Sequence, residues 1–232
     1  MNTKTSQYIY EILQYTFKDH KLLNHAMLHP SHAMYNVSAK FNYEKLELLG
    51  DAVLSLVITQ QLLEKFPLEN EGDLAKRKAY LVSGDTIAAI ARQKKLGKII
   101  SMSPTEQENH GQNTTHNLEN ALEAIIGAIY IDGGLPKAEN IVKKLWQPYI
   151  IKDAIPPQNP KSILQEIAQA SKQDLTYAII KTGPSHKPIF TARATLNISA
   201  DGTASSKQKA EVKAAQNILS LINETITKYS KK

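Results

Sequence analysis

The stretch 42–56, NYEKLELLGDAVLSL, constrains this chain most, because it combines an apolar stripe with a strip of acids. Apolar residues recur there at the spacing of one face of an amphipathic helix: Leu46, Leu49, Val53, Leu54 and Val57. Glu44, Glu47 and Asp51 stand at i, i+3 and i+7, which at about 100° per residue confines them to an arc of roughly 60°. The spacing predicts a helix with one buried face and one acidic face.

Three like charges on one strip destabilise an isolated helix, so their repulsion needs an offset. A solvated acidic face is one interpretation. The other is a site for a hard divalent cation such as Mg²⁺, which takes carboxylate and water oxygens. Gly50 favours the cation site, because a glycine inside a helix costs about 1 kcal/mol relative to alanine. That cost is understandable if another backbone or a ligand has to approach the helix beside Asp51.

Composition and charge favour a cytoplasmic protein with two domains and no membrane association. The chain has 232 residues and no cysteine, which excludes a disulfide framework and a thiolate metal site. Its first residues are polar, and we expect no membrane span. Residues 159–232 hold 11 Lys and Arg against 5 Asp and Glu, a net charge of +6, whereas residues 1–158 hold 17 of each. This asymmetry indicates that catalysis and polyanion binding are divided between domains.

The acidic stretch resembles the signature motif of the bacterial ribonuclease III family, which reads Asn, Glu, Arg or Lys, Leu, Glu, Phe or Leu, Leu, Gly, Asp, Ser or Ala, Val or Ile, Leu. Nearly every position matches. The resemblance implies an all-α catalytic domain over residues 1–151 that forms a homodimer. It also implies an endoribonuclease that hydrolyses double-stranded RNA to 5′-phosphate and 3′-hydroxyl ends, in rRNA and mRNA processing, with Mg²⁺ or, in its place, Mn²⁺.

A second acid-bearing helix is predicted in the stretch HNLENALEAIIGAIYIDGG, which begins at His116. The resemblance implies that Asp51 and Glu123 are catalytic and that the metal ligands are Glu47, Asp51, Asn120 and Glu123. Asn120 departs from the family, which has aspartate there. An amide oxygen still ligates a cation but brings no charge, so we expect weaker metal binding. Glu119 points about 100° away around the helix and is a poor replacement.

Other features of the first domain carry narrower expectations. The resemblance implies that Glu44 and Glu71 lie near the substrate and the dimer interface. His29 and His32 are interpreted as turn residues around Pro30 rather than as bases.

The spacing of polar residues makes Asp73 a plausible helix N-cap, and Ser83 or Asp85 the next one. The run 76–78, Lys-Arg-Lys, is either a solvated helix face or a phosphate contact. Residues 101–117 are expected to form a loop, and Trp146 is expected in the core.

A proline-bearing linker, residues 152–160, precedes a small α+β domain at 161–228 with the element order α-β-β-β-α. Its apolar alternation at Phe190, Ala192 and Ala194 predicts a sheet with one covered face. The order resembles the double-stranded-RNA-binding domain, whose members read A-form shape. The resemblance assigns six residues to RNA binding: Ser162, Gln165, Glu166, His186, Lys207 and Lys209. Two positions depart from the family pattern, Ala204 for glycine and Gln208 for a second Lys or Arg.

We therefore expect a dimeric, divalent-metal-dependent endoribonuclease that acts on double-stranded RNA. The alternative, based on Asn120, is a double-stranded-RNA-binding protein with weak or no cleavage. A metal-dependent enzyme acting on small phosphates is disfavoured by the basic second domain.

Overall fold

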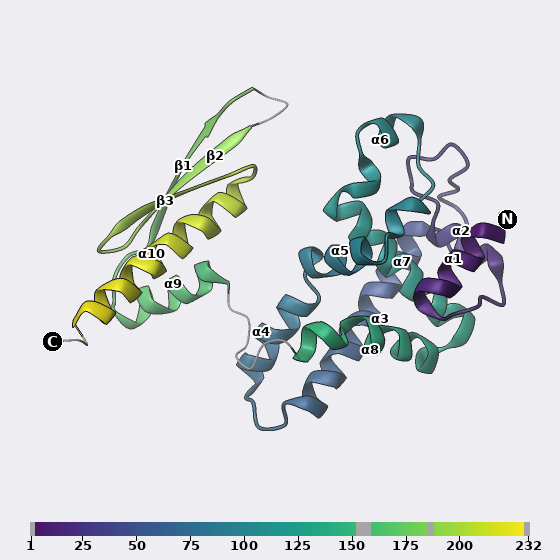
Figure 1. Ribbon diagram of the computed structural model, residues 1–232, viewed down its shortest axis with the longest axis horizontal. Helices are drawn as coiled ribbons and strands as arrows, with labels where there is room; N and C mark the ends of the chain where they lie inside the picture. The colour runs from purple at the N-terminus through teal and green to yellow at the C-terminus, as the bar shows by residue number, and fades with distance from the viewer. Residues whose placement is uncertain (1–2, 152–158, 185–187, 230–232) are drawn as a thin grey trace. The chain divides into compact units, whose positions relative to one another are not determined.

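The computed structural model describes residues 3–151, 159–184 and 188–229 (Figure 1). The chain divides into two compact units, residues 1–157 and residues 158–232. Each unit has its own cluster of buried apolar side chains. Most of the predicted linker lies outside the described residues, and so does His186.

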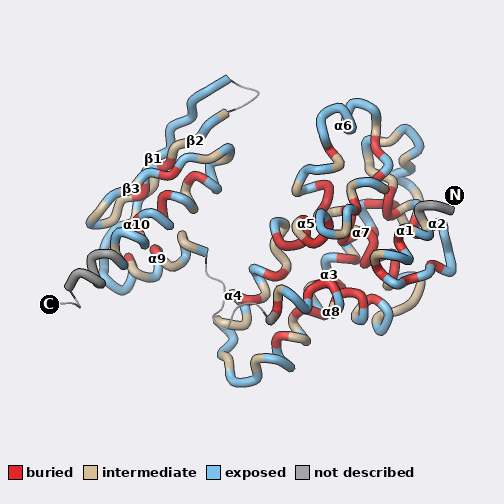
Figure 2. The backbone as a smooth tube through the Cα atoms, viewed as in Figure 1, coloured by how far each residue is buried: buried red, intermediate tan, exposed pale blue. Residues whose placement is uncertain are grey.

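The regular elements in the described residues of the first unit are all helices, which confirms the expected fold class. Its helices run in chain order: α1 (Thr3–Leu13), α2 (His20–Ala26), α3 (Tyr43–Lys65), α4 (Glu71–Leu81), α5 (Gly84–Gln93), α6 (Pro104–Glu108), α7 (Thr115–Gly133) and α8 (Leu135–Ile151). Two 3-10 turns, η1 (Leu96–Lys98) and η2 (Gly111–Asn113), connect them. Buried positions are dense along α3 and α7, which form the centre of this unit (Figure 2).

Helix α3 contains the acidic stretch and begins at an N-cap, Asn42, whose side chain accepts a hydrogen bond from the backbone N–H of Lys45. Its length and composition alone would suit a membrane span. Eight of its residues are nevertheless buried in the protein core, including Leu46, Val53 and Leu54. These residues form the apolar face that the sequence predicts, so α3 is a core helix.

Helices α3 and α7 cross with their backbones in contact, at Gly50 and Gly127. A Cβ atom added to Gly50 would overlap the carbonyl oxygen of Glu123, and one added to Gly127 would overlap the carbonyl oxygen of Leu46. The sequence predicts that a backbone or ligand approaches Gly50, and the approaching group is the backbone of α7. Because the helices touch at this point, residues beside it on both helices face the same region.

Several local expectations need correction. The N-cap of α4 is Asn70, which accepts from the N–H of Asp73, so Asp73 lies inside the helix rather than capping it. Ser83 does cap α5. The segment 101–117 is not wholly a loop, because it contains α6, η2 and the start of α7. Proline at the first position of α6 supplies a helix start that outweighs the polar composition.

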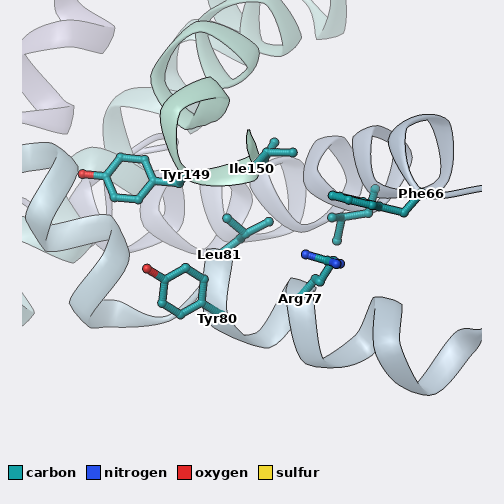
Figure 3. A pocket seen from close by; sticks show the side chains of 7 residues that line it. Phe66, Arg77, Tyr80, Leu81, Tyr149 and Ile150 are labelled. Carbon is teal, nitrogen blue, oxygen red and sulfur yellow. The ribbon is translucent and has the colours of Figure 1, made fainter. Parts of the chain in front are cut away.

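Arg77 also departs from expectation, because its side chain is buried instead of solvated or free to touch phosphate. Its guanidinium donates to both carboxylate oxygens of Glu69, at 2.7 and 2.6 Å, and lies 3.9 Å from the centre of the Phe66 ring. Figure 3 shows Arg77 beside Phe66 in a small pocket between α3, α4 and α8. Near this pocket, the indole of Trp146 is fully buried as expected and donates to the carbonyl of Leu81 at 2.8 Å.

The second unit has the predicted order, α9 (Pro160–Ala170), β1 (Thr176–Thr182), β2 (Ile189–Thr195), β3 (Ser199–Ala204) and α10 (Lys207–Tyr229). The three strands form an antiparallel sheet in sequence order. Its inner face is covered by α9 and α10, and Ala192 and Ala194 are buried there. Gly202 brings β3 against α10, because a Cβ there would overlap the backbone of Ala214.

Candidate functional site

The crossing of α3 and α7 creates a cluster of acids. On α3, Glu47 is partly buried and Asp51 is exposed. On α7, the side chain of Glu123 is buried, with 7% of its surface exposed. Because Gly50 and Gly127 let the helices touch, Glu123 lies against the segment of α3 that carries Glu47 and Asp51.

Burial and mutual proximity shift the pKa values of these acids. The pKa of Glu123 is raised to about 8, mainly by burial, which disfavours the charged form. The negative charges of Asp51, Glu119 and Glu47 raise this pKa further, in that order. The pKa of Glu47 is also raised, again first by burial. The cluster therefore holds more negative charge than its own surroundings stabilise.

Tyr43 lies beneath the acids, fully buried in the interior of the first unit. Its hydroxyl donates to the carbonyl oxygen of Asn117, the residue that begins the buried face of α7, at 3.4 Å. Burial raises the pKa of Tyr43, and the charges of Glu47 and Glu123 raise it further. The buried Tyr43 side chain thus stays neutral next to Glu47 and Glu123.

Asn120 lies one turn before Glu123 on α7 and is partly exposed. Its side-chain Nδ2 is 3.4 Å from Nε2 of His116. Glu119 was expected to point away from the site, but it lies near enough for its charge to raise the pKa of Glu123. Its carboxylate also lies at the first residue of α5, where a Cβ on Gly84 would collide with it.

The donor set suits a hard divalent cation, since it consists of carboxylate oxygens from Glu47, Asp51 and Glu123 and one amide oxygen from Asn120. Burial is the main cause of the raised pKa of Glu123, and a cation here would offset the second cause, the repulsion between the acids. Within the described part of the chain, however, no three acidic or histidine side chains enclose a single metal-sized point. The ligand atoms are of the type that a divalent cation prefers, but the side chains as placed do not converge on a single coordination centre.

Two further acids, Glu44 and Glu71, were predicted to lie near the substrate and the dimer interface. Glu44 is exposed in the first turn of α3 and accepts a hydrogen bond of 2.5 Å from the hydroxyl of Tyr35. Burial and this contact raise the pKa of Tyr35 to about 12. Glu71 is the first residue of α4 and is exposed. No described contact links Glu71 to the acid cluster of Glu47, Asp51 and Glu123.

The second unit presents its predicted RNA-binding residues from two helices. Ser162, Gln165 and Glu166 are exposed on α9, at i, i+3 and i+4, and therefore share one face. Lys207 and Lys209 are exposed in the first turn of α10, where free backbone N–H groups favour an anion. This combination suits a polyanion with hydroxyl groups.

Sequence reasoning missed two residues beside the acid cluster, His116 and Tyr43. The signal for His116 was its position four residues before Asn120, which places both side chains on one helical face. Tyr43 was hidden because an aromatic residue in an apolar stripe is typical of a core position.

Comparison with known protein families covers both units. Residues 19–149 match a family described as Ribonuclease-III-like. Residues 160–222 match the double-stranded RNA binding motif. The chain is 46% identical to Ribonuclease 3 of Ehrlichia canis (strain Jake) over 222 residues, which cover 94% of this chain and 98% of the relative. It is 43% identical to Ribonuclease 3 of Wolbachia pipientis wMel over 221 residues, 93% of this chain and 95% of the relative.

The first unit also resembles solved structures. A crystal structure of the nuclease domain of ribonuclease III from Campylobacter jejuni is 40% identical, with a TM-score of 0.59, covering 66% of this chain and 99% of that one. Another structure of that domain, described for flexibility in a region involved in dimer formation, is 42% identical with a TM-score of 0.58, covering 62% of this chain and 99% of that one.

Proposed function

Because the chain belongs to the ribonuclease III family of double-stranded-RNA-specific endoribonucleases, we propose that it cuts RNA duplexes with the help of divalent cations. The crossing of α3 and α7 at Gly50 carries this proposal. It brings the acids of two helices together, and burial, followed by the repulsion of the neighbouring acids, raises the pKa of Glu123. We expect Mg²⁺ as the physiological ion and Mn²⁺ as a substitute.

The side chains of Glu47, Asp51 and Glu123 would hold the cations, and Asn120 would add a neutral oxygen ligand. When bound, such ions lower the pKa of water and neutralise charge on phosphate oxygens. Glu123 gives up its proton when it becomes a ligand, since metal binding requires the carboxylate form. The products carry 5′-phosphate and 3′-hydroxyl ends.

A homodimer is part of the proposal, and the surface of α3 supports it. Leu48, Leu56 and Leu63 are 73%, 55% and 57% exposed and lie on one side of the helix, next to the acidic strip. An exposed apolar stripe of this kind is typical of a protein interface. Two copies joined along α3 would place one acid cluster per protomer near a shared duplex, so that each protomer cuts one strand.

The second unit would hold the substrate. Ser162, Gln165 and Glu166 would meet 2′-hydroxyl groups in a minor groove, and Lys207 and Lys209 would meet phosphates. Recognition of A-form shape rather than sequence suits the duplex regions of ribosomal and messenger RNA precursors in the cytoplasm, and we propose these as substrates.

The test is to incubate the purified chain with a long RNA duplex and Mg²⁺. We expect short duplex fragments that a 5′-phosphate-dependent exonuclease degrades. Intact RNA, together with a gel shift, would instead support a double-stranded-RNA-binding protein with little or no cleavage.

A Glu123→Gln variant then tests the site. Loss of the carboxylate should abolish cleavage and leave RNA binding in Ca²⁺ unchanged. Glu139→Gln is the matched control, because Glu139 pairs with Lys143 on α8. Its cleavage rate should equal that of the parent chain. Equal loss of cleavage and RNA binding in Glu123→Gln would contradict the assigned role.

A further inference from the structure

Asn120 raises a problem of orientation that an aspartate at the same position would not have. Both oxygens of a carboxylate attract a cation, whereas an amide has one attractive oxygen and an NH₂ group that repels it. An asparagine that rotates freely would present the wrong end for part of the time. A cation site built with Asn120 therefore needs a group that selects one orientation of the amide.

His116 is placed to select it. Its Nε2 atom lies 3.4 Å from Nδ2 of Asn120, one helical turn away on α7. An amide nitrogen only donates, so the imidazole must accept through Nε2, in the tautomer that carries its proton on Nδ1. With the NH₂ group turned to His116, the Oδ1 atom of Asn120 is left for the acid cluster.

We infer that His116 is a positioning residue, which holds the Asn120 amide so that its oxygen faces the cation held by Glu47, Asp51 and Glu123. This inference rests on the proposed function, because it requires a cation in the cluster. His116 itself is exposed and lies in the first turn of α7.

The test measures the affinity for Mn²⁺ by calorimetry on the full chain without RNA. His116→Leu removes the acceptor and should weaken Mn²⁺ binding by about twofold, because about half of the amide then presents its NH₂ end. His116→Gln keeps an acceptor, since its Oε1 atom can receive the NH₂ group, and should bind Mn²⁺ as tightly as the parent. Thermal unfolding checks that both variants fold.

The His116→Leu substitution is then tested in a chain that carries Asn120→Asp. Both oxygens of a carboxylate can bind a cation, so the new side chain would not need His116 to orient it. In a chain that carries Asn120→Asp, the further change His116→Leu should not weaken Mn²⁺ binding at all. Equal weakening by His116→Leu with and without Asn120→Asp would show a general structural effect and overturn the inference. Unchanged Mn²⁺ binding in His116→Leu alone would also overturn it, provided that Glu123→Gln weakens binding. A parent chain that binds no Mn²⁺ would instead overturn the proposed cation site.

Discussion

Glu123 is an ionisable side chain that lies almost out of contact with water, so its protonation is linked to folding. Its pKa in the folded chain is about 8, above the ordinary 4.5. Between these values the folded state binds more protons than the unfolded state. Without metal, stability should therefore fall as the pH rises from about 5 to about 8. Chemical denaturation in EDTA across this range measures the effect.

The Glu123→Gln variant is the control for this linkage, because glutamine does not titrate. Its stability should vary less with pH over the same range. If the parent chain and Glu123→Gln show the same pH dependence, burial of the Glu123 carboxyl is not its source. Ca²⁺ should stabilise the parent more at pH 8 than at pH 5, since it competes with the proton.

Residue spacing predicted which helix face a side chain occupies, but not which partner that side chain contacts. The periodic spacing of Glu47 and Asp51 located them on one face, and the residue pattern around Glu123 placed it on the second acidic helix. The contacts of Arg77 and His116 depend on which way a side chain turns, which spacing does not determine. Arg77 stood in a basic run that suggested solvent, yet Glu69 and Phe66 offered it a buried partner and a ring.

At the scale of elements, the contact of α3 with α7 depends on two missing side chains. Gly50→Ala should destabilise the chain by about 1–3 kcal/mol, because the new methyl group forces the helices apart. Cleavage should fall with it, since Asp51 and Glu123 separate. Urea denaturation and an RNA-cleavage assay measure the two effects.

Gly72→Ala is the matched control for this substitution. Gly72 is exposed near the start of α4, where an added Cβ would meet only the Asn70 side chain, at 3.2 Å. Alanine favours a helix by about 1 kcal/mol over glycine, so this variant should be as stable as the parent or slightly more stable. Similar losses at Gly50 and Gly72 would argue against a specific crossing.

The exposed leucines of α3 carry a second prediction at this scale. Leu56→Lys with Leu63→Lys should shift the chain from dimer to monomer in sedimentation measurements, because two charges would then face each other across the interface. Leu68→Lys is the control, since Leu68 is 98% exposed in the turn after α3 and lies off the stripe. A dimer that survives the double substitution would place the interface elsewhere.

Elements were predicted better than their contacts. Apolar periodicity identified the helical character of both acid-bearing segments, and alternation identified the covered sheet face. Gly50 predicted that another group approaches α3. It did not identify that group as α7, because nothing local in the sequence pairs Gly50 with Gly127. The helix α6 was missed, since a proline and four polar residues give no apolar periodicity.

At the scale of the whole molecule, the net positive charge lies in the second unit, which we expect to bind RNA phosphates. Lys207→Ala with Lys209→Ala should lower the slope of log affinity against log salt by about 1.8, because each lost phosphate contact removes about 0.9. Binding of RNA duplexes over a range of KCl concentrations measures the slope. Cleavage at saturating RNA should change little.

Lys172→Asn is the control for this prediction. It removes the same kind of charge from the turn after α9, and asparagine tolerates the left-handed backbone found there, with φ of 55°. An equal change of slope per lysine in this variant would indicate a diffuse attraction rather than contacts at the start of α10. The division into units was readable from the proline-bearing linker, and the net charge on either side of it then indicated a basic second unit.

Each unit encloses its own apolar cluster, which has a consequence for synthesis on the ribosome. Residues 1–157 contain every side chain of the larger cluster, so this unit can collapse while later codons are still being translated. The nascent nuclease half can then reach its native form before its RNA-holding half exists.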